Sequence, residues 1–200
     1  MPFLAVFSTP SFGLKTSTIQ LKEVVCIGSG ATTITLLPVL AQGSSIVTML
    51  QRSPSYIASI PNRTSSSWLW RQIPRPLAYT LNRLWFMIVP MRFYVFRRMF
   101  PTTSSNLIRR GAAKQLPEGY PTDPDFNPRY NPFDQRVCFA PNGEFYAAIC
   151  SGWANVVTGT IEKIVDDGII LKYGVKIVAD MIITATGPKL QLGGRNHRWN

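Results

Sequence analysis

The stretch KEVVCIGSGATTITLLPVLAQG, residues 22–43, joins an apolar run to a helix-forming run through two glycines. Its first part, Lys22–Ile27, is short and mostly apolar, which is typical of a strand buried in a parallel sheet. Its second part predicts a helix over Ala31–Gln42 that stops at Gly43, because glycine commonly follows the last turn of a helix. Pro38 is expected to kink this helix or to shorten its last turn.

The turn between the predicted strand and helix reads GSGATT, residues 28–33. Gly28 permits a tight turn, and Gly30 lets the backbone approach a pyrophosphate at the helix N-terminus, where free N–H groups favour anions. A second strand is predicted over Ser45–Gln51, so the order strand, glycine turn, helix, strand indicates a right-handed parallel β–α–β unit. We therefore expect an α/β, Rossmann-like nucleotide-binding domain. Thr33 replaces the third glycine of the G-x-G-x-x-G pattern, so a purely structural turn is the alternative interpretation.

Arg52 directly follows the second predicted strand. An acid at this place would hydrogen-bond the ribose 2′-hydroxyl of NAD, whereas an arginine forms charge-assisted bonds to the 2′-phosphate of NADP. Ser53 adds a hydroxyl donor. The spacing from the glycine turn therefore favours NADPH as the ligand. Taken alone, Arg52 is also consistent with a surface arginine at a strand end.

The 200-residue chain carries a formal net charge of +11, although only 16% of its residues are charged. No Asp or Glu occurs between Val24 and Pro117. The basic residues of this stretch are Arg52, Arg63, Arg71, Arg75, Arg83, Arg92, Arg97, Arg98, Arg109, Arg110 and Lys114. Such a stretch is expected to be attracted to phosphate, whether on a cofactor, a lipid surface or a nucleic acid.

Several classes of site are excluded by the residue types available. The three cysteines, Cys26, Cys138 and Cys150, are widely spaced and form no C-x-x-C, so neither a disulfide framework nor a metal site is expected. We therefore expect the protein to be in a reducing compartment, the cytoplasm. His197 is the only histidine and lies near the C-terminus, which argues against histidine-dependent triads. The apolar run Leu84–Met91 is much shorter than the roughly 20 residues of a membrane span, so no transmembrane helix is predicted.

An insert over about residues 64–116 is predicted to be helical, basic and aromatic. From Trp68 to Phe100 it mixes arginines with Trp, Tyr, Phe and Leu, interrupted by Pro74, Pro76 and Pro90. We expect short amphipathic helices rather than one continuous helix, because proline interrupts helical hydrogen bonding. The insert is interpreted as a cover over the substrate site; a membrane-surface contact is the alternative, since Trp and Arg favour that interface.

The remaining segments define the expected domain limits. Residues 1–21 are predicted to be a disordered leader, residues 22–194 the nucleotide-binding domain, and residues 195–200 a tail. Residues 53–67 are expected to be loop. The stretch 116–136 is dense in Pro, Asn and Asp and predicts turns and extended loop.

The last quarter of the chain has a β pattern in which DDG and YG supply turns. We expect a C-terminal β-meander followed by a nearly all-apolar buried strand. The predicted strands lie near Val156 and over Ile161–Val165, Ile169–Leu171, Lys176–Val178 and Met181–Thr184.

Four segments together resemble the central part of flavin-dependent monooxygenases of the Baeyer–Villiger and flavin-containing types. They are residues 22–41, VTMLQRSPSYIASIP (47–61), residues 116–174 with the specific block YNPFDQRVC (130–138), and ADMIITATG (179–187). The resemblance runs to about residue 194. It implies use of FAD, NADPH and oxygen, with one oxygen atom inserted into a ketone or a soft heteroatom of a small lipophilic substrate.

The resemblance also assigns site residues. It implies that Arg136 is catalytic, lying beside flavin and nicotinamide where a fixed guanidinium stabilises negative charge. Without the resemblance, Arg136 would be an ordinary loop arginine. The residues expected to bind cofactor are Gly28, Ser29, Gly30, Ala31, Thr32, Arg52, Ser53, Gln135, Thr186 and Gly187.

The chain departs from this family in lacking an earlier glycine turn for FAD. We therefore expect a fold truncated relative to one with two dinucleotide domains, a fragment without most of the FAD-binding half. The alternatives are a non-catalytic NADP-binding remnant and a basic module that associates with membrane surfaces. No nucleic acid partner is expected, because no RNA- or DNA-binding motif accompanies the arginines.

Overall fold

The computed structural model describes residues 21–60 and 74–187. The predicted leader and tail, and the beginning of the insert, lie outside these ranges, so the predicted domain limits stay predictions.

A four-stranded parallel sheet forms the centre of the fold, in the order β5–β2–β1–β9. Its strands are β1 (Glu23–Ile27), β2 (Ile46–Gln51), β5 (Ala154–Thr158) and β9 (Met181–Thr184). Helix α1 (Ala31–Ala41) connects β1 to β2, so the predicted parallel β–α–β unit and Rossmann-like fold class are confirmed.

Both faces of this sheet are buried, which explains why its strands read as apolar runs. Val24 and Cys26 pack on one face with residues of α1 and of α5 (Glu144–Cys150). Val25 points to the other face and packs with residues of the C-terminal meander. Because side chains alternate along a strand, one apolar run supplies both cores.

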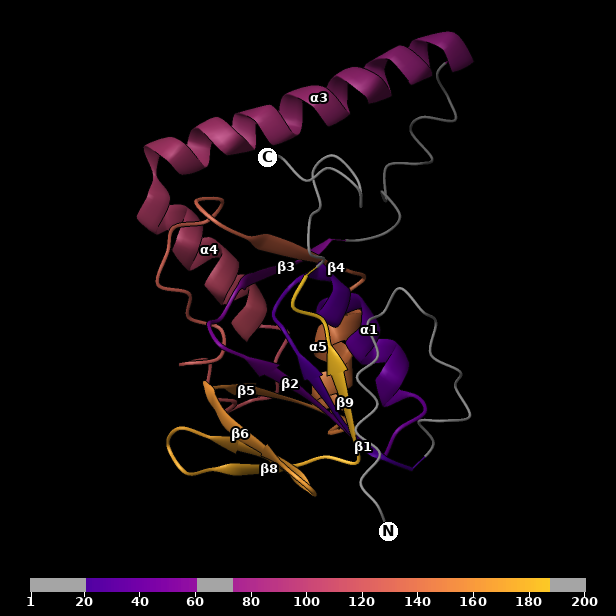
Figure 1. The fold of residues 1–200 in the computed structure, drawn as a ribbon. Helices are drawn as coiled ribbons and strands as arrows, with labels where there is room; N and C mark the ends of the chain where they lie inside the picture. The colour runs from indigo at the N-terminus through magenta and orange to yellow at the C-terminus, as the bar shows by residue number, and fades with distance from the viewer. Residues whose placement is uncertain (1–20, 61–73, 188–200) are drawn as a thin grey trace, which may run out of the picture.

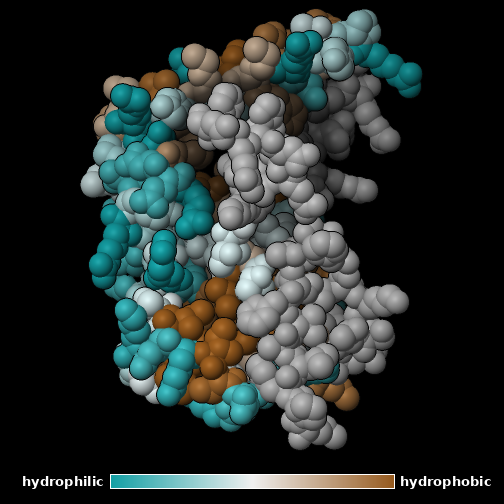
Figure 2. All heavy atoms as spheres, viewed as in Figure 1, coloured by the Kyte–Doolittle hydropathy of each residue, from teal (hydrophilic) through white to brown (hydrophobic). Residues whose placement is uncertain are grey.

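The C-terminal meander is confirmed nearly residue for residue. It consists of β6 (Ile161–Val165), β7 (Gly168–Leu171) and β8 (Lys176–Val178), all antiparallel. Hydrophobic residues gather over this region on the face shown in Figure 2. Val175, directly before β8, and Val178, at its end, are exposed.

The prediction of loop over residues 53–67 is wrong in part, because β3 (Tyr56–Ile60) is a strand. It pairs in parallel with β4 (Val137–Pro141), about eighty residues later. Tyr56 and Ile57 are buried by this pairing and by α4 (Pro101–Ala113). A five-residue strand whose partner is so distant has little local signal.

The prediction of short helices over Trp68–Phe100 is also wrong, because α3 is one continuous helix over Arg75–Met99. Pro76 lies in its first turn, where the missing N–H would have no intrahelical partner in any case. Pro90 lies inside the helix and removes one hydrogen bond without ending it. Figure 1 shows α3 as a long arm across the top of the molecule, joined to the body through α4.

Candidate functional site

Gly28 directly follows β1 and makes the first bend of the glycine turn. Its φ is +143°, and a Cβ added to it would lie 2.5 Å from the carbonyl oxygen of Ala185. Its N–H donates a 2.9 Å hydrogen bond to the carbonyl of Leu50. Only glycine fits here, because the backbone after β9 passes directly against this residue. Thr33, at the place of the third glycine, is fully buried.

Gly30 is the residue that precedes α1. It has extended backbone, makes no side-chain cap, and has nothing within 4 Å of the position that a Cβ would take. The first turn of α1 contains no acidic residue. The N–H groups of this turn therefore face open space with the positive end of the helix dipole behind them, which suits an anion.

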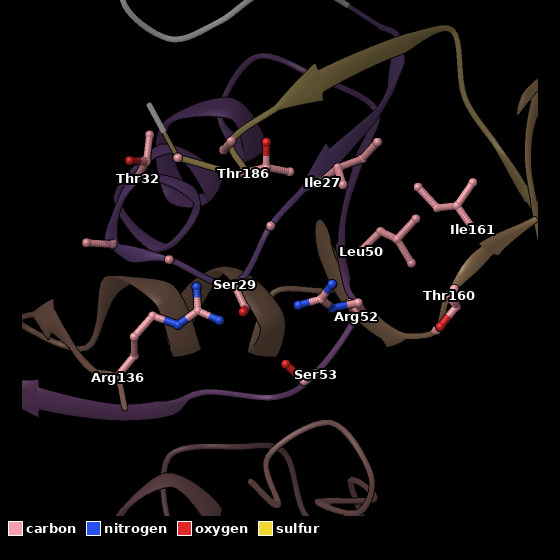
Figure 3. A pocket seen from close by; sticks show the side chains of 16 residues that line it. Ile27, Ser29, Thr32, Leu50, Arg52, Ser53, Arg136, Thr160, Ile161 and Thr186 are labelled. Carbon is pink, nitrogen blue, oxygen red and sulfur yellow. The ribbon is translucent and has the colours of Figure 1, made fainter. Parts of the chain in front are cut away.

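A cavity of about 610 Å³ lies over this turn at the carboxyl ends of the parallel strands. Arg52 reaches into it from the end of β2, and Arg136 reaches into it from the opposite side, with Ser29 between them (Figure 3). The lining residues are Ile27, Gly28, Ser29, Gly30, Ala31, Thr32, Leu50, Arg52, Ser53, Arg136, Gly159, Thr160, Ile161, Ala185, Thr186 and Gly187. Two guanidinium groups and no carboxylate line this cavity, so it favours phosphate.

The structure brings together every predicted site residue except Gln135 around this one cavity. Gln135 lines a neighbouring cavity of about 820 Å³, which shares Arg52 and Ser53 with the first. Sequence reasoning missed Gly159 and Thr160, which follow β5. Their signal was present, because in open parallel sheets ligands bind at the carboxyl ends of the strands.

The loop over residues 117–136 closes one side of both cavities and is fixed to the sheet through Gln51. The fully buried Gln51 donates from Nε2 to the carbonyl of Asp125 (2.8 Å) and to Thr158 Oγ1 (2.9 Å). Thr158 Oγ1 in turn donates to Asp125 Oδ1 (2.6 Å). Burial raises the pKa of the Asp125 carboxyl above its ordinary value, and the hydrogen bonds from Thr158 partly oppose this shift.

The part of the loop that carries Arg136 is held by two tyrosines. Tyr56 Oη donates to the carbonyl of Tyr130 (2.7 Å), and Tyr130 Oη donates to the carbonyl of Arg136 (2.9 Å). The two rings meet edge to face, with centroids 5.4 Å apart. The backbone of Arg136 is therefore fixed relative to β3, while its side chain projects into the cavity.

Arg97 connects the same loop to α3. Its guanidinium donates to the carbonyl of Pro132, lies 3.4 Å from Asp134 Oδ1, and stacks on the rings of Tyr94 and Phe133. Arg97 is the one buried residue of α3. These contacts attach the C-terminal end of α3 to residues 132–134, directly before Gln135.

Within residues 21–60 and 74–187, none of the helices combines the length and the apolar character that a membrane span requires. The same ranges contain no cluster of three or more His, Cys, Asp or Glu side chains that could hold a metal ion.

No protein-family model matches the chain. Among curated proteins it is similar to the FAD-containing monooxygenase EthA of Mycolicibacterium smegmatis, at 43% identity over 180 residues, covering 86% of this chain and 36% of that protein. EthA of Mycobacterium tuberculosis is 45% identical over 175 residues, with the same coverage. The probable FAD-binding monooxygenase AlmA of Acinetobacter baylyi is 41% identical, covering 86% and 35%. The chain thus spans about a third of the length of these relatives.

Solved structures share the fold at much lower identity. The closed form of cyclohexanone monooxygenase matches with a TM-score of 0.63 and 16% identity, covering 92% of this chain and 42% of that one. A complex of OTEMO with FAD and NADP matches with a TM-score of 0.61 and 15% identity, covering 90% and 41%.

Proposed function

Because the chain is a relative of the FAD-containing monooxygenases and matches about a third of their length, we propose that it is their NADPH-binding portion. The cavity over the glycine turn would hold the dinucleotide, with its pyrophosphate against the N-terminus of α1. The observation that carries this proposal is the position of Arg52 at the end of β2, in a cavity without a carboxylate.

Each end of the cofactor has residues that suit it. Arg52 and Ser53 would bind the 2′-phosphate through charge-assisted hydrogen bonds. The open space beside Gly30 would receive the pyrophosphate, and Thr186 and Gly187 would lie toward the nicotinamide. When bound, NADPH supplies the hydride that reduces a flavin.

Arg136 is the residue that we propose to act in catalysis. Its guanidinium would lie beside the nicotinamide and stabilise negative charge near it, because the tyrosine-held backbone fixes where the side chain starts. The described residues contain a single G-x-G turn between a parallel strand and a helix, Gly28–Gly30, which we assign to NADPH. We expect FAD to be held by another part of the enzyme, and a small lipophilic ketone or heteroatom compound to be the substrate.

The proposal is tested by titrating the purified chain with NADPH and with NADH. We expect NADPH to bind more tightly, and Arg52→Ala to remove the difference at a loss of about 1.5–3 kcal/mol in NADPH binding. Arg110→Ala, which removes the same charge from α4 away from both cavities, is the control. Equal affinity of the unmodified chain for the two cofactors would contradict the proposal.

A non-catalytic NADP-binding protein is separated from this proposal by turnover. The measurement is oxygen-dependent oxidation of NADPH by the purified chain with added FAD, and again with a flavin-binding partner supplied. Turnover in the second case and its loss in Arg136→Ala would support the catalytic assignment. Binding of NADPH without turnover in either case would support the alternative.

A second candidate function, contact with an anionic membrane surface, is favoured by α3. The helix contains five arginines and no acid, and most of its large apolar side chains are exposed. The exposed aromatic residues are Tyr79, Trp85, Phe86, Phe93, Tyr94 and Phe96. In Figure 2 hydrophobic and hydrophilic residues alternate along this arm at the top of the molecule. Such a helix suits the boundary between headgroups and acyl chains, with arginine heads reaching lipid phosphates.

A further inference from the structure

The second cavity, of about 820 Å³, has no role in the function proposed so far beyond the two residues it shares with the first. Arg52 and Ser53 form the boundary between the two cavities. On its far side the second cavity is lined by the loop over residues 123–135. Arg129, Gln135 and Asn127 are among its lining residues on that side.

The charge of this cavity is suited to a phosphate monoester. Arg52 and Arg129 are its two cations, and Asp123 is the one carboxylate among its lining residues. Asn127 Nδ2 donates to Asp123 Oδ2 at 3.3 Å, which satisfies part of that carboxylate within the loop. A phosphate monoester carries a charge of about −1.5 to −2 at neutral pH and has three acceptor oxygens. One arginine and one serine leave such a group incompletely neutralised.

The loop holds Arg129 in a defined place relative to Arg52. Gln51, the residue before Arg52, donates to the carbonyl of Asp125, so the strand end and the loop are directly bonded. The carbonyl of Tyr130, the residue after Arg129, accepts a hydrogen bond from Tyr56 Oη. Arg129 therefore lies between two points of the backbone that are hydrogen-bonded to β2 and β3.

We propose that Arg129, with Gln135 beside it, completes the binding site for the 2′-phosphate of NADPH from the side opposite Arg52. The phosphate would lie at the boundary of the two cavities, with donors from β2 on one side and from the loop on the other. Arg129 thereby determines cofactor specificity together with Arg52. This inference rests on the proposed function, because it assumes that the first cavity holds NADPH.

The test compares two adenosine phosphates by calorimetric titration. 2′,5′-ADP carries the 2′-phosphate, and 5′-AMP lacks it but keeps the base, the ribose and the 5′-phosphate. We expect Arg129→Ala to weaken binding of 2′,5′-ADP about tenfold or more, since it removes a charge-assisted contact. Binding of 5′-AMP should be unchanged. Arg110→Ala, with the same loss of charge on α4, should bind both ligands as the unmodified chain does.

The outcomes separate this inference from the proposed function. Equal affinity of Arg129→Ala and the unmodified chain for 2′,5′-ADP would overturn the inference while leaving the role of Arg52 intact. Equal weakening of both ligands would also overturn it, because Arg129 would then contact the base or ribose. Failure of the unmodified chain to prefer 2′,5′-ADP over 5′-AMP would overturn both. Thermal unfolding of each variant checks that its fold is retained.

Discussion

Nε2 of Gln51 lies 2.8 Å from the carbonyl oxygen of Asp125, and this hydrogen bond joins the last residue of β2 to the loop that closes the site. Arg52 is the residue after Gln51 in the chain, and the segment that carries Arg129 and Arg136 follows Asp125. This buried amide therefore holds the loop that carries Arg129 to the end of β2, while Tyr130 Oη holds the backbone of Arg136.

Replacing Gln51 by Leu should lower the free energy of unfolding by about 1–3 kcal/mol, because a buried carbonyl and a hydroxyl lose their donor. Urea denaturation measures this change. Gln42→Leu, at an exposed position just after α1, is the control and should change stability little. NADPH binding should fall in Gln51→Leu even where the chain is folded. Unchanged stability and binding would show that the loop is held by other contacts.

Asp125 gives a pH dependence whose sign follows from its raised pKa. The folded state binds this proton more tightly than the unfolded state, so its contribution to stability is fully present below the ordinary pKa of 3.8 and is lost as pH rises through the raised value. Asp125→Asn keeps an acceptor for Thr158 without the charge. We expect its stability relative to the unmodified chain to increase as the pH rises from the ordinary pKa of 3.8 through the raised pKa of Asp125. A difference that does not vary with pH would contradict the buried charge.

Replacing each glycine of the turn by alanine should affect a different property, stability at Gly28 and NADPH binding at Gly30. Gly28→Ala should destabilise the fold, because its Cβ would meet the carbonyl of Ala185 at 2.5 Å and its φ of +143° is strained for any other residue. Gly30→Ala should leave stability nearly unchanged, because open space surrounds that position, but should weaken NADPH binding by obstructing the phosphate. Thermal unfolding of both variants measures the change in stability, and titration with NADPH measures the change in affinity. A Gly30→Ala variant with full affinity would place the phosphate elsewhere.

Arg97 should control how firmly α3 is attached. Arg97→Ala removes the contacts with Asp134, the carbonyl of Pro132 and two aromatic rings. We expect chymotrypsin to cleave within α3 several-fold faster, since local opening becomes easier. The neighbouring Arg98→Ala is the control, because Arg98 is exposed and its one described hydrogen bond reaches Tyr94 Oη at 3.4 Å. Equal cleavage rates in the two variants would argue against the anchor.

The membrane proposal predicts salt-sensitive binding to vesicles of anionic lipid and little binding to neutral vesicles. Changing Arg83 and Arg92 of α3 to Glu should abolish the binding measured by co-sedimentation. Changing Arg109 and Arg110 of α4 to Glu gives a variant of the same net charge as the α3 double variant. This second change should reduce vesicle binding less. If the two double variants lose binding equally, net charge rather than α3 is responsible.

Patterns that are complete within a short stretch were predictable. The strand, glycine turn, helix and strand from Glu23 to Gln51 follow from local apolar runs and two glycines, and the meander follows from its turn residues. Arg52 could be assigned because a parallel β–α–β unit fixes where the second strand ends relative to the glycine turn.

What the sequence left undetermined depends on contacts between distant residues. β3 exists because β4 pairs with it from about eighty residues away. Arg129 joins Arg52 at one cavity because Gln51 holds the loop to the sheet. Local chemistry therefore decided which elements form around the glycine turn. Only tertiary packing decided which side chains share a site, because buried hydrogen bonds between remote segments are formed only when the chain folds.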